Sequence, residues 1–105
     1  MSEELINVSL LSDLPDGQMK GVQVAGKEIL IVNVEGTIYA MGGICTHREW
    51  PLIDGVLDGH RVICNGHGAF WDIRTGKAEY SMPLPKEIIY EVKVEGDEIF
   101  VKVQK

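Results

Sequence analysis

Two short segments, Cys45-Thr46-His47 and Cys64-Asn65-Gly66-His67, each supply one cysteine and one histidine. Together they contain both cysteines and two of the three histidines of this 105-residue chain. The spacings are C-x-H and C-x-x-H, and sixteen residues separate His47 from Cys64. That interval is long enough for a short strand pair between two loops, so the two segments can converge. The sequence therefore predicts one metal site with Cys45, His47, Cys64 and His67 as ligands.

Two thiolates and two imidazoles are the ligand set of a Rieske [2Fe-2S] cluster. In the expected arrangement Cys45 and Cys64 hold one iron, and His47 and His67 hold the other. Imidazoles are neutral, so the oxidised cluster carries less negative charge than an all-cysteine cluster. It therefore accepts an electron more readily, which raises its reduction potential.

Composition narrows the class of protein further. The chain is 45% apolar, which suits one domain spanning residues 1–105. Both cysteines fall in the predicted site, and residues 1–4 lack the pattern of a signal peptide, so we expect a cytoplasmic protein. The aliphatic run at residues 29–32 is far too short to span a membrane. A net charge of −6 argues against nucleic acid and anionic lipid as partners. That charge either favours docking on a basic face of another protein or only keeps the chain soluble.

Short segments rich in β-forming residues alternate with turn signals, which predicts an all-β fold. The expected strands cover residues 6–10, 19–24, 28–33, 37–41, 61–64, 69–72, 88–94 and 98–103. The expected turns are Glu35-Gly36, Asp58-Gly59, Thr75-Gly76 and Gly96-Asp97. The last turn joins two alternating segments into a hairpin. Residues from about 42 to 72 form a cluster-binding subdomain inserted between strands of the main sheets.

The pattern Cys45-x-His47…Cys64-x-x-His67-Gly68, followed by Phe70-x-Asp72 and Thr75-Gly76, resembles the Rieske ferredoxin family. The resemblance covers nearly the whole chain. Residues 45–52 are similar to the first cluster loop of the small ferredoxins that serve bacterial ring-hydroxylating dioxygenases. The resemblance implies an antiparallel β-sandwich with a small cluster-binding subdomain at one end. It also implies one [2Fe-2S] cluster, histidine ligands at the edge nearest solvent, and a proline loop at Pro83-Leu84-Pro85 packed over the cluster.

The chain departs from the family pattern at several positions. In cytochrome bc-type relatives each cluster loop carries an additional cysteine, and the matching positions here hold Trp50 and Gly66. Those relatives also place hydroxyl donors to the cluster sulfurs after the second histidine, where Ala69 and Trp71 stand here. Losing those hydroxyls predicts a potential in the lower part of the Rieske range of roughly −150 to +300 mV. Asn65 replaces the usual proline, which leaves the rigidity of the second loop open.

The expected function is electron transfer and not catalysis. A Rieske oxygenase also needs a mononuclear iron held by two histidines and a carboxylate. After the cluster takes His47 and His67, only His60 remains, and we expect His60 to be an exposed polar residue beside a turn. The protein would then be a one-electron carrier between an NAD(P)H-linked flavin reductase and a terminal oxygenase or similar acceptor. We expect a monomer that docks through Arg48, Glu49, Trp50 and residues 83–85.

Two alternatives stay open at this point. The same ligand types could form a structural zinc site, which would be colourless and redox-silent. A cluster could instead serve as a sensor, or the chain could be a small Rieske subunit of a larger complex such as a nitrite reductase. Co-purification with a large partner would distinguish that case from a free carrier.

Overall fold

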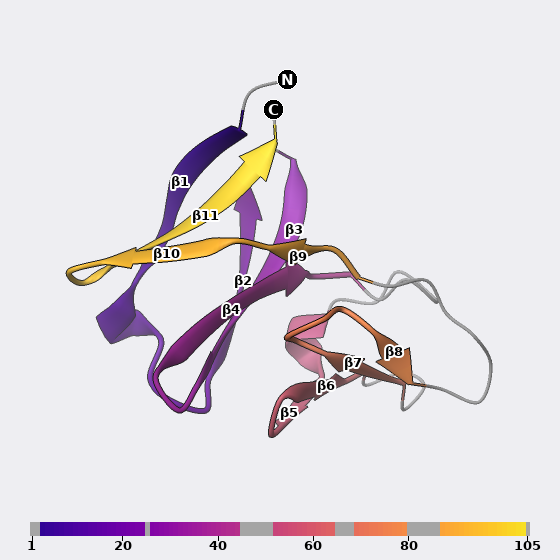
Figure 1. Cartoon of the computed structure of the whole chain (residues 1–105). Coiled ribbons are helices and arrows are strands. Elements are labelled where there is room, and N and C mark those ends of the chain that lie inside the picture. The colour runs from indigo at the N-terminus through magenta and orange to yellow at the C-terminus, as the bar shows by residue number, and fades with distance from the viewer. Residues whose placement is uncertain (1–2, 25, 45–51, 65–68, 80–86, 105) are drawn as a thin grey trace.

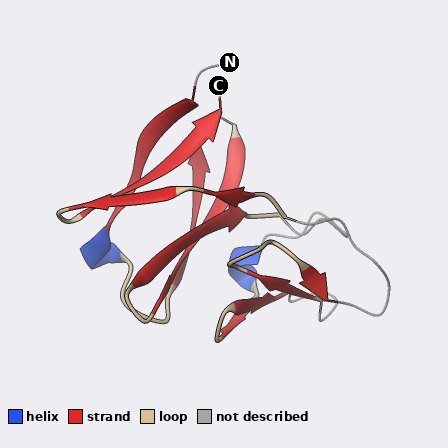
Figure 2. Ribbon diagram, viewed as in Figure 1, coloured by secondary structure: helices blue, strands red, loops and turns tan. Residues whose placement is uncertain are grey.

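A computed structural model describes residues 3–24, 26–44, 52–64, 69–79 and 87–104. Two antiparallel sheets form a sandwich, and a third, smaller sheet lies beside it (Figures 1 and 2). In the order in which the strands pair, the first sheet contains β1 (Glu3–Leu10), β11 (Glu98–Gln104) and β10 (Val92–Glu95). The second contains β2 (Met19–Val24), β3 (Lys27–Val34), β4 (Thr37–Gly42) and β9 (Ile89–Tyr90). The small sheet contains β5 (Val56–Asp58), β6 (Arg61–Ile63), β7 (Phe70–Asp72) and β8 (Ala78–Glu79).

Strand β3 is buried on both faces and separates two cores. Ile29 and Ile31 point toward the first sheet and belong to a buried cluster with Val101 of β11. Leu30 and Val32 point the other way and belong to a cluster with residues of the small sheet. Successive side chains of a strand point to opposite faces, so an uninterrupted apolar run suits a strand covered on both sides. The molecule therefore has three layers, and the second sheet is the middle one.

The predicted all-β fold is confirmed, and so is the expected hairpin around Gly96-Asp97, where Val94 pairs with Ile99. The turns at Glu35-Gly36, Thr75-Gly76 and Gly96-Asp97 are present, whereas the turn expected at Asp58-Gly59 lies one residue later, at Gly59-His60, because Asp58 pairs with Arg61. Among the described residues, Glu35 is the non-glycine residue with a positive φ, at 53°, beside Gly36 at 87°. Two positive φ angles are what a two-residue hairpin turn requires, and Gly36 meets this requirement without strain.

The expected strand list needs three corrections. The structure contains β5 and β8, two short strands that the sequence pattern did not predict. The strand predicted over residues 88–94 is two strands, because β9 pairs with β4 whereas β10 pairs with β11. The chain changes sheet at Glu91, whose carbonyl oxygen accepts a hydrogen bond from the Lys102 amide at 2.9 Å. Alternation of apolar residues cannot show this change, because both pieces keep the same period.

Helical structure in the described residues is limited to two short 3-10 helices, η1 (Leu11–Asp13) and η2 (Leu52–Asp54). No helix in this described part is long and apolar enough to cross a membrane. The small sheet extends to Glu79, beyond the boundary near residue 72 that we expected for the cluster-binding subdomain.

Gly76 gives a test of this architecture. Its φ is +77°, its amide donates to the Asp72 carbonyl at 2.7 Å, and its own carbonyl accepts from the Glu87 amide at 2.9 Å. A Cβ at Gly76 would collide with the Glu87 carbonyl oxygen, whereas a Cβ at Gly59, with φ +62°, would meet open space. Gly59→Ala should lower the free energy of unfolding by about 1 kcal/mol through backbone strain alone. Gly76→Ala should cost at least about twice as much, because backbone must also move.

The thermal unfolding midpoint of each cluster-loaded variant, followed by circular dichroism, would measure this difference. Equal losses in the two variants would contradict the close approach of Gly76 to Glu87.

Candidate metal centre

Cys64 directly follows β6 and is buried, with 2% of its surface exposed. Its amide donates a hydrogen bond to the Ala69 carbonyl oxygen at 2.8 Å, which continues the β6–β7 pairing by one step. This bond joins the two residues that flank residues 65–68. Those residues include the rest of the predicted C-x-x-H segment, which begins at Cys64. Of the four predicted ligands, Cys64 is the one inside the described residues; Cys45, His47 and His67 lie outside them.

The first predicted segment is likewise joined at its flanks. The Leu52 amide donates to the Gly43 carbonyl at 2.8 Å, and the Gly43 amide donates to Glu28 of β3 at 2.9 Å. Gly43 lies so close to β3 that an added Cβ would come within 3.2 Å of the Glu28 backbone. The residues on either side of 45–51 therefore meet where β4 ends.

The residues that follow 80–86, a range that includes the predicted proline loop at 83–85, are also tied to the end of β4. The Glu87 amide bonds to Gly76, and the Gly42 amide bonds to the Ile88 carbonyl at 2.8 Å. The adjacent glycines Gly42 and Gly43 thus bond to residues that follow 80–86 and 45–51, respectively. Cys64 bonds across 65–68 to Ala69. Described residues next to all three segments, 45–51, 65–68 and 80–86, therefore lie at the same end of the molecule. The segment 83–85 and the expected docking residues Arg48, Glu49 and Trp50 themselves lie outside the described residues.

The buried surroundings of Cys64 fit a sulfur-ligated cluster. Cys64 belongs to a buried cluster whose other members are Leu30, Val32, Met41, Leu52, Val62, Ala69, Trp71 and Ile73. Thiolate is the preferred ligand type for iron–sulfur clusters, and a dry apolar surround limits solvent access. One buried polar atom in this core, Nε1 of Trp71, has no hydrogen-bond partner among the described residues. The donor set and this N–H both suit a site that holds a sulfur-rich group.

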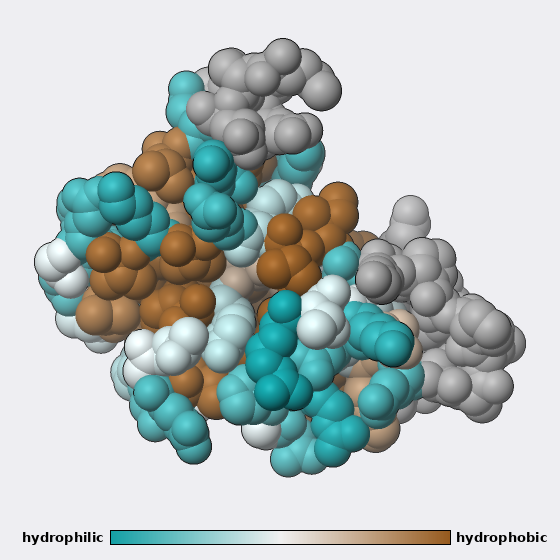
Figure 3. Space-filling model, viewed as in Figure 1, coloured by the Kyte–Doolittle hydropathy of each residue, from teal (hydrophilic) through white to brown (hydrophobic). Residues whose placement is uncertain are grey.

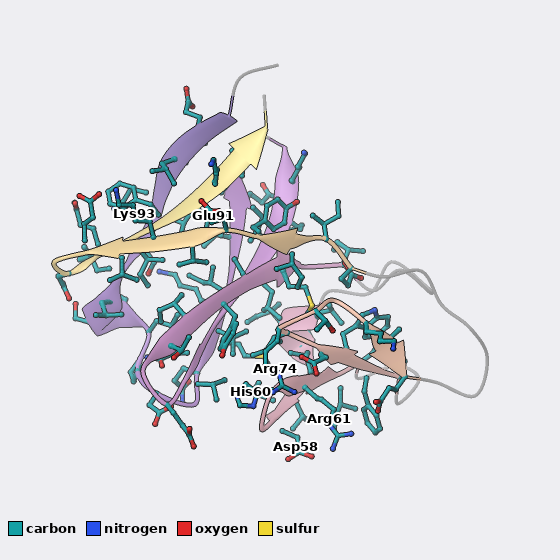
Figure 4. All side chains as sticks on the ribbon, viewed as in Figure 1. Asp58, His60, Arg61, Arg74, Glu91 and Lys93 are labelled. Atoms are coloured by element: carbon teal, nitrogen blue, oxygen red, sulfur yellow. The ribbon has the colours of Figure 1, made fainter. Side chains whose placement is uncertain are left out.

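His60 was predicted to be an exposed polar residue, and this prediction is wrong. The structure places it half-buried at the β5–β6 turn, on the side toward β4 (Figure 4). Its ring packs edge-on against Tyr39, with the ring centroids 5.9 Å apart. Its carbonyl oxygen accepts the Ile73 amide at 2.9 Å. Within the described ranges no group of three or more His, Cys, Asp and Glu residues could hold a metal ion. The contact with Tyr39 gives His60 a packing role.

Asp72 organises the turn after β7, a role that the sequence motif did not reveal. Its carboxylate accepts hydrogen bonds from the Arg74 amide at 2.8 Å and from two guanidinium nitrogens of Arg74 at 3.1 and 3.0 Å. These bonds favour the charged carboxylate, and the side-chain bond to Arg74 is the main reason that the pKa of Asp72 lies below its usual value. The Asp72 backbone pairs with Lys77 and Gly76. Asp72 therefore fixes the position of Gly76, to which Glu87 is tied.

Comparison with known proteins agrees with the ligand pattern. The family model of the Rieske [2Fe-2S] domain matches residues 4–95. A ferredoxin component of naphthalene 1,2-dioxygenase/salicylate 5-hydroxylase systems from Ralstonia sp. is 40% identical over 105 residues, covering 99% of this chain and all of the relative. The ferredoxin of carbazole 1,9a-dioxygenase from Nocardioides aromaticivorans IC177 superposes with a TM-score of 0.87 at 29% identity, covering 92% of this chain and 95% of that one.

A second solved structure, a complex of reduced oxygenase and oxidised ferredoxin of carbazole 1,9a-dioxygenase, contains a chain that matches with a TM-score of 0.86 at 28% identity. The match covers 92% of this chain and 91% of that one.

This chain belongs to the Rieske [2Fe-2S] domain family. It is a small ferredoxin of that family, an electron carrier that holds one [2Fe-2S] cluster per chain. The predictions of fold family, cofactor and electron-transfer role are confirmed, and the zinc alternative is rejected. The identity of the four ligands stays a prediction.

Substitution of the three histidines tests the ligand assignment. His47→Ala and His67→Ala should each abolish the cluster, because each removes one of the four predicted iron ligands. His60→Ala should retain the cluster, since His60 packs on Tyr39. Iron and acid-labile sulfide analysis, with the visible absorption spectrum, would measure cluster content. A cluster retained in His67→Ala and lost in His60→Ala would contradict the assignment.

Proposed function

We propose that this protein carries single electrons from an NAD(P)H-linked flavin reductase to the terminal oxygenase of an aromatic-ring dioxygenase system, in the cytoplasm. The observation that carries the proposal is the end-to-end match with a ferredoxin component of such a system, 40% identical over 105 residues. A solved chain of similar size and fold occurs in complex with an oxygenase, which supports an oxygenase as the acceptor.

The cluster supplies a one-electron centre when it is bound, and the chain holds and shields it. Cys45 and Cys64 would provide the sulfur ligands and His47 and His67 the nitrogen ligands. Cys64 is buried in an apolar core, so on its side water is excluded. We therefore expect electrons to enter and leave on the side of the histidines, whose imidazole edges the family resemblance places nearest solvent.

Exposed apolar side chains lie near the end of the molecule where the ligand segments meet. Ile88, whose carbonyl bonds to Gly42, is 62% exposed, and Ile89 is 38% exposed. Figure 3 shows hydrophobic side chains gathered over β9, in the middle of the view. Transient electron-transfer complexes bury small areas, so a few exposed apolar groups beside the site can contribute much of the contact.

The net negative charge of the protein lies outside residues 42–86, the part of the chain that contains the predicted ligands. Residues 42–86 carry five acidic and five basic side chains, so the whole charge of −6 lies on the rest of the chain. Six exposed carboxylates occupy three neighbouring turns of the sandwich: Asp13, Asp16, Glu35, Glu95, Asp97 and Glu98. Ser12 bonds to Asp97, and the Glu35 amide bonds to Asp16, which joins these turns. We call these three turns the acidic end, and its β10–β11 turn lies on the side of the sandwich opposite the small sheet (Figure 1).

Spectroscopy and reconstitution test the proposed function. The dithionite-reduced protein should give a rhombic low-temperature EPR signal with an average g below the free-electron value, as mixed histidine and cysteine ligation requires. Mixed with the reductase and terminal oxygenase of a naphthalene 1,2-dioxygenase system, it should support NADH-dependent substrate oxidation. The variant Cys64→Ser, without a cluster, should not. A normal EPR signal with no electron transfer to the oxygenase would refute that acceptor and leave the carrier assignment intact.

The charge distribution makes a second prediction, on salt dependence. Because residues 42–86 are neutral overall, docking through this part should depend weakly on ionic strength. The second-order rate constant for electron transfer to the oxygenase, measured by stopped-flow absorbance, should change by less than about threefold between about 20 and about 200 mM salt. A steep fall with salt would instead support docking on a basic partner face through the acidic end.

A further inference from the structure

Among the described residues, Trp71 carries the one indole N–H of the core that contains Cys64. The side chain is fully buried, at 0% exposure, in the middle of β7. Its Nε1 has no hydrogen-bond partner among the residues that the structure describes. Buried polar groups in folded proteins are nearly always bonded, because an unbonded one loses its hydration without compensation. A fully buried N–H without a partner therefore needs an explanation.

The strand register places Trp71 on the same face as Cys64. Trp71 pairs with Val62, and the next step of the pairing on this face is Cys64 with Ala69, joined by the Cys64 amide bond to Ala69. Side chains two positions apart on a strand share a face, so these four residues form one patch. All four are buried, whereas Arg61, Ile63, Phe70 and Asp72 on the opposite face are exposed or half-buried.

Apart from Cys64, the described side chains of this core include no strong hydrogen-bond acceptor for the indole N–H of Trp71. Leu30, Val32, Leu52, Val62, Ala69 and Ile73 have apolar side chains, and the thioether of Met41 is a weak acceptor. Cys64 is the exception in the described part of this core. As a cluster ligand its sulfur is a thiolate, which carries negative charge and accepts hydrogen bonds far better than a thiol.

We propose that the Trp71 N–H donates a hydrogen bond to a sulfur of the bound cluster and thereby raises its reduction potential. The inference rests on the proposed function, because it requires the cluster. Reduction adds negative charge that is shared by the sulfurs, so a donor aimed at a sulfur stabilises the reduced form more than the oxidised form. Trp71 then supplies a donor at a position where the family resemblance predicted that one is lost.

The first test compares purified holoprotein with Trp71→Phe, which keeps an aromatic ring and removes the N–H. At a fixed ambient potential near the midpoint, the ratio of reduced to oxidised cluster should fall by about two- to tenfold in Trp71→Phe. Val62→Ala is the matched control, since it removes packing atoms beside Trp71 and no donor. Its ratio should stay near that of the wild type. An unchanged ratio in Trp71→Phe, or an equal fall in Val62→Ala, would overturn the proposal.

A second measurement reports on the hydrogen bond directly. Pulsed ENDOR of the reduced cluster, in H2O and in D2O, detects exchangeable protons close to the cluster. Trp71→Phe should lack one such coupling that wild type and Val62→Ala both show. If all three proteins show the same exchangeable couplings, the N–H does not reach a cluster sulfur.

If Trp71→Phe fails to load a cluster, an isosteric change keeps the test available. Incorporation of 5-fluorotryptophan in a Trp50→Phe background makes the indole N–H at Trp71 more acidic and should shift the ratio toward the reduced form. No shift would overturn the proposal. Failure of the wild-type EPR signal would overturn the proposed function instead, so the two failures are distinguishable.

Discussion

The packing of the small sheet against β3 and β4 is the contact on which the position of the metal centre depends. Val62 and Trp71 on one side meet the layer formed by Leu30, Val32 and Met41 on the other, and all five side chains are fully buried. Cys64 continues the same buried face as Val62. The sulfur therefore takes its place from apolar packing that does not itself involve a metal.

Backbone hydrogen bonds complete this arrangement, because they join the described residues that flank each predicted ligand segment. Gly43 bonds to both β3 and Leu52, and Cys64 bonds to Ala69. Holding ligand segments at both flanks reduces the conformational entropy that is lost when the cluster binds. Asp72 contributes from a distance, since its contacts with Arg74 shape the turn that leads to Gly76.

Most of the fold could be predicted from local patterns, and the failures have physical causes. Residues 19–24 were predicted with the correct bounds, because Met19–Val24 lies between clear turn signals. β8 could not be predicted, because Ala78 and Glu79 have little β-propensity and form a strand only by pairing with β7. The change of sheet at Glu91 depends on which strands lie nearby, and periodicity carries no information about that.

Some features of the candidate site could likewise be predicted from the sequence, and others could not. Cysteine and histidine spacing predicted the cofactor, since the ligand types themselves define the chemistry. Two features required the three-dimensional packing: the contact of His60 with Tyr39 and the buried N–H of Trp71. The burial of Trp71 could have been predicted, because Val62 and Cys64 on one strand and Ala69 and Trp71 on the next lie two positions apart and therefore share one face. The lack of any described partner for the indole could not be deduced from that pattern.

The pairing of β1 with β11 has a consequence for the order in which the protein folds. Glu4 pairs with Val103, so one edge of the sandwich joins residues from opposite ends of the sequence. β5, β6, β7 and β8 follow one another as a meander in which each strand pairs with its neighbour in the chain. Contacts of low sequence separation form fast, and distant pairings form slowly. On the ribosome the small sheet can therefore assemble early, whereas the sandwich has to wait for β11, which follows the other described strands in the sequence.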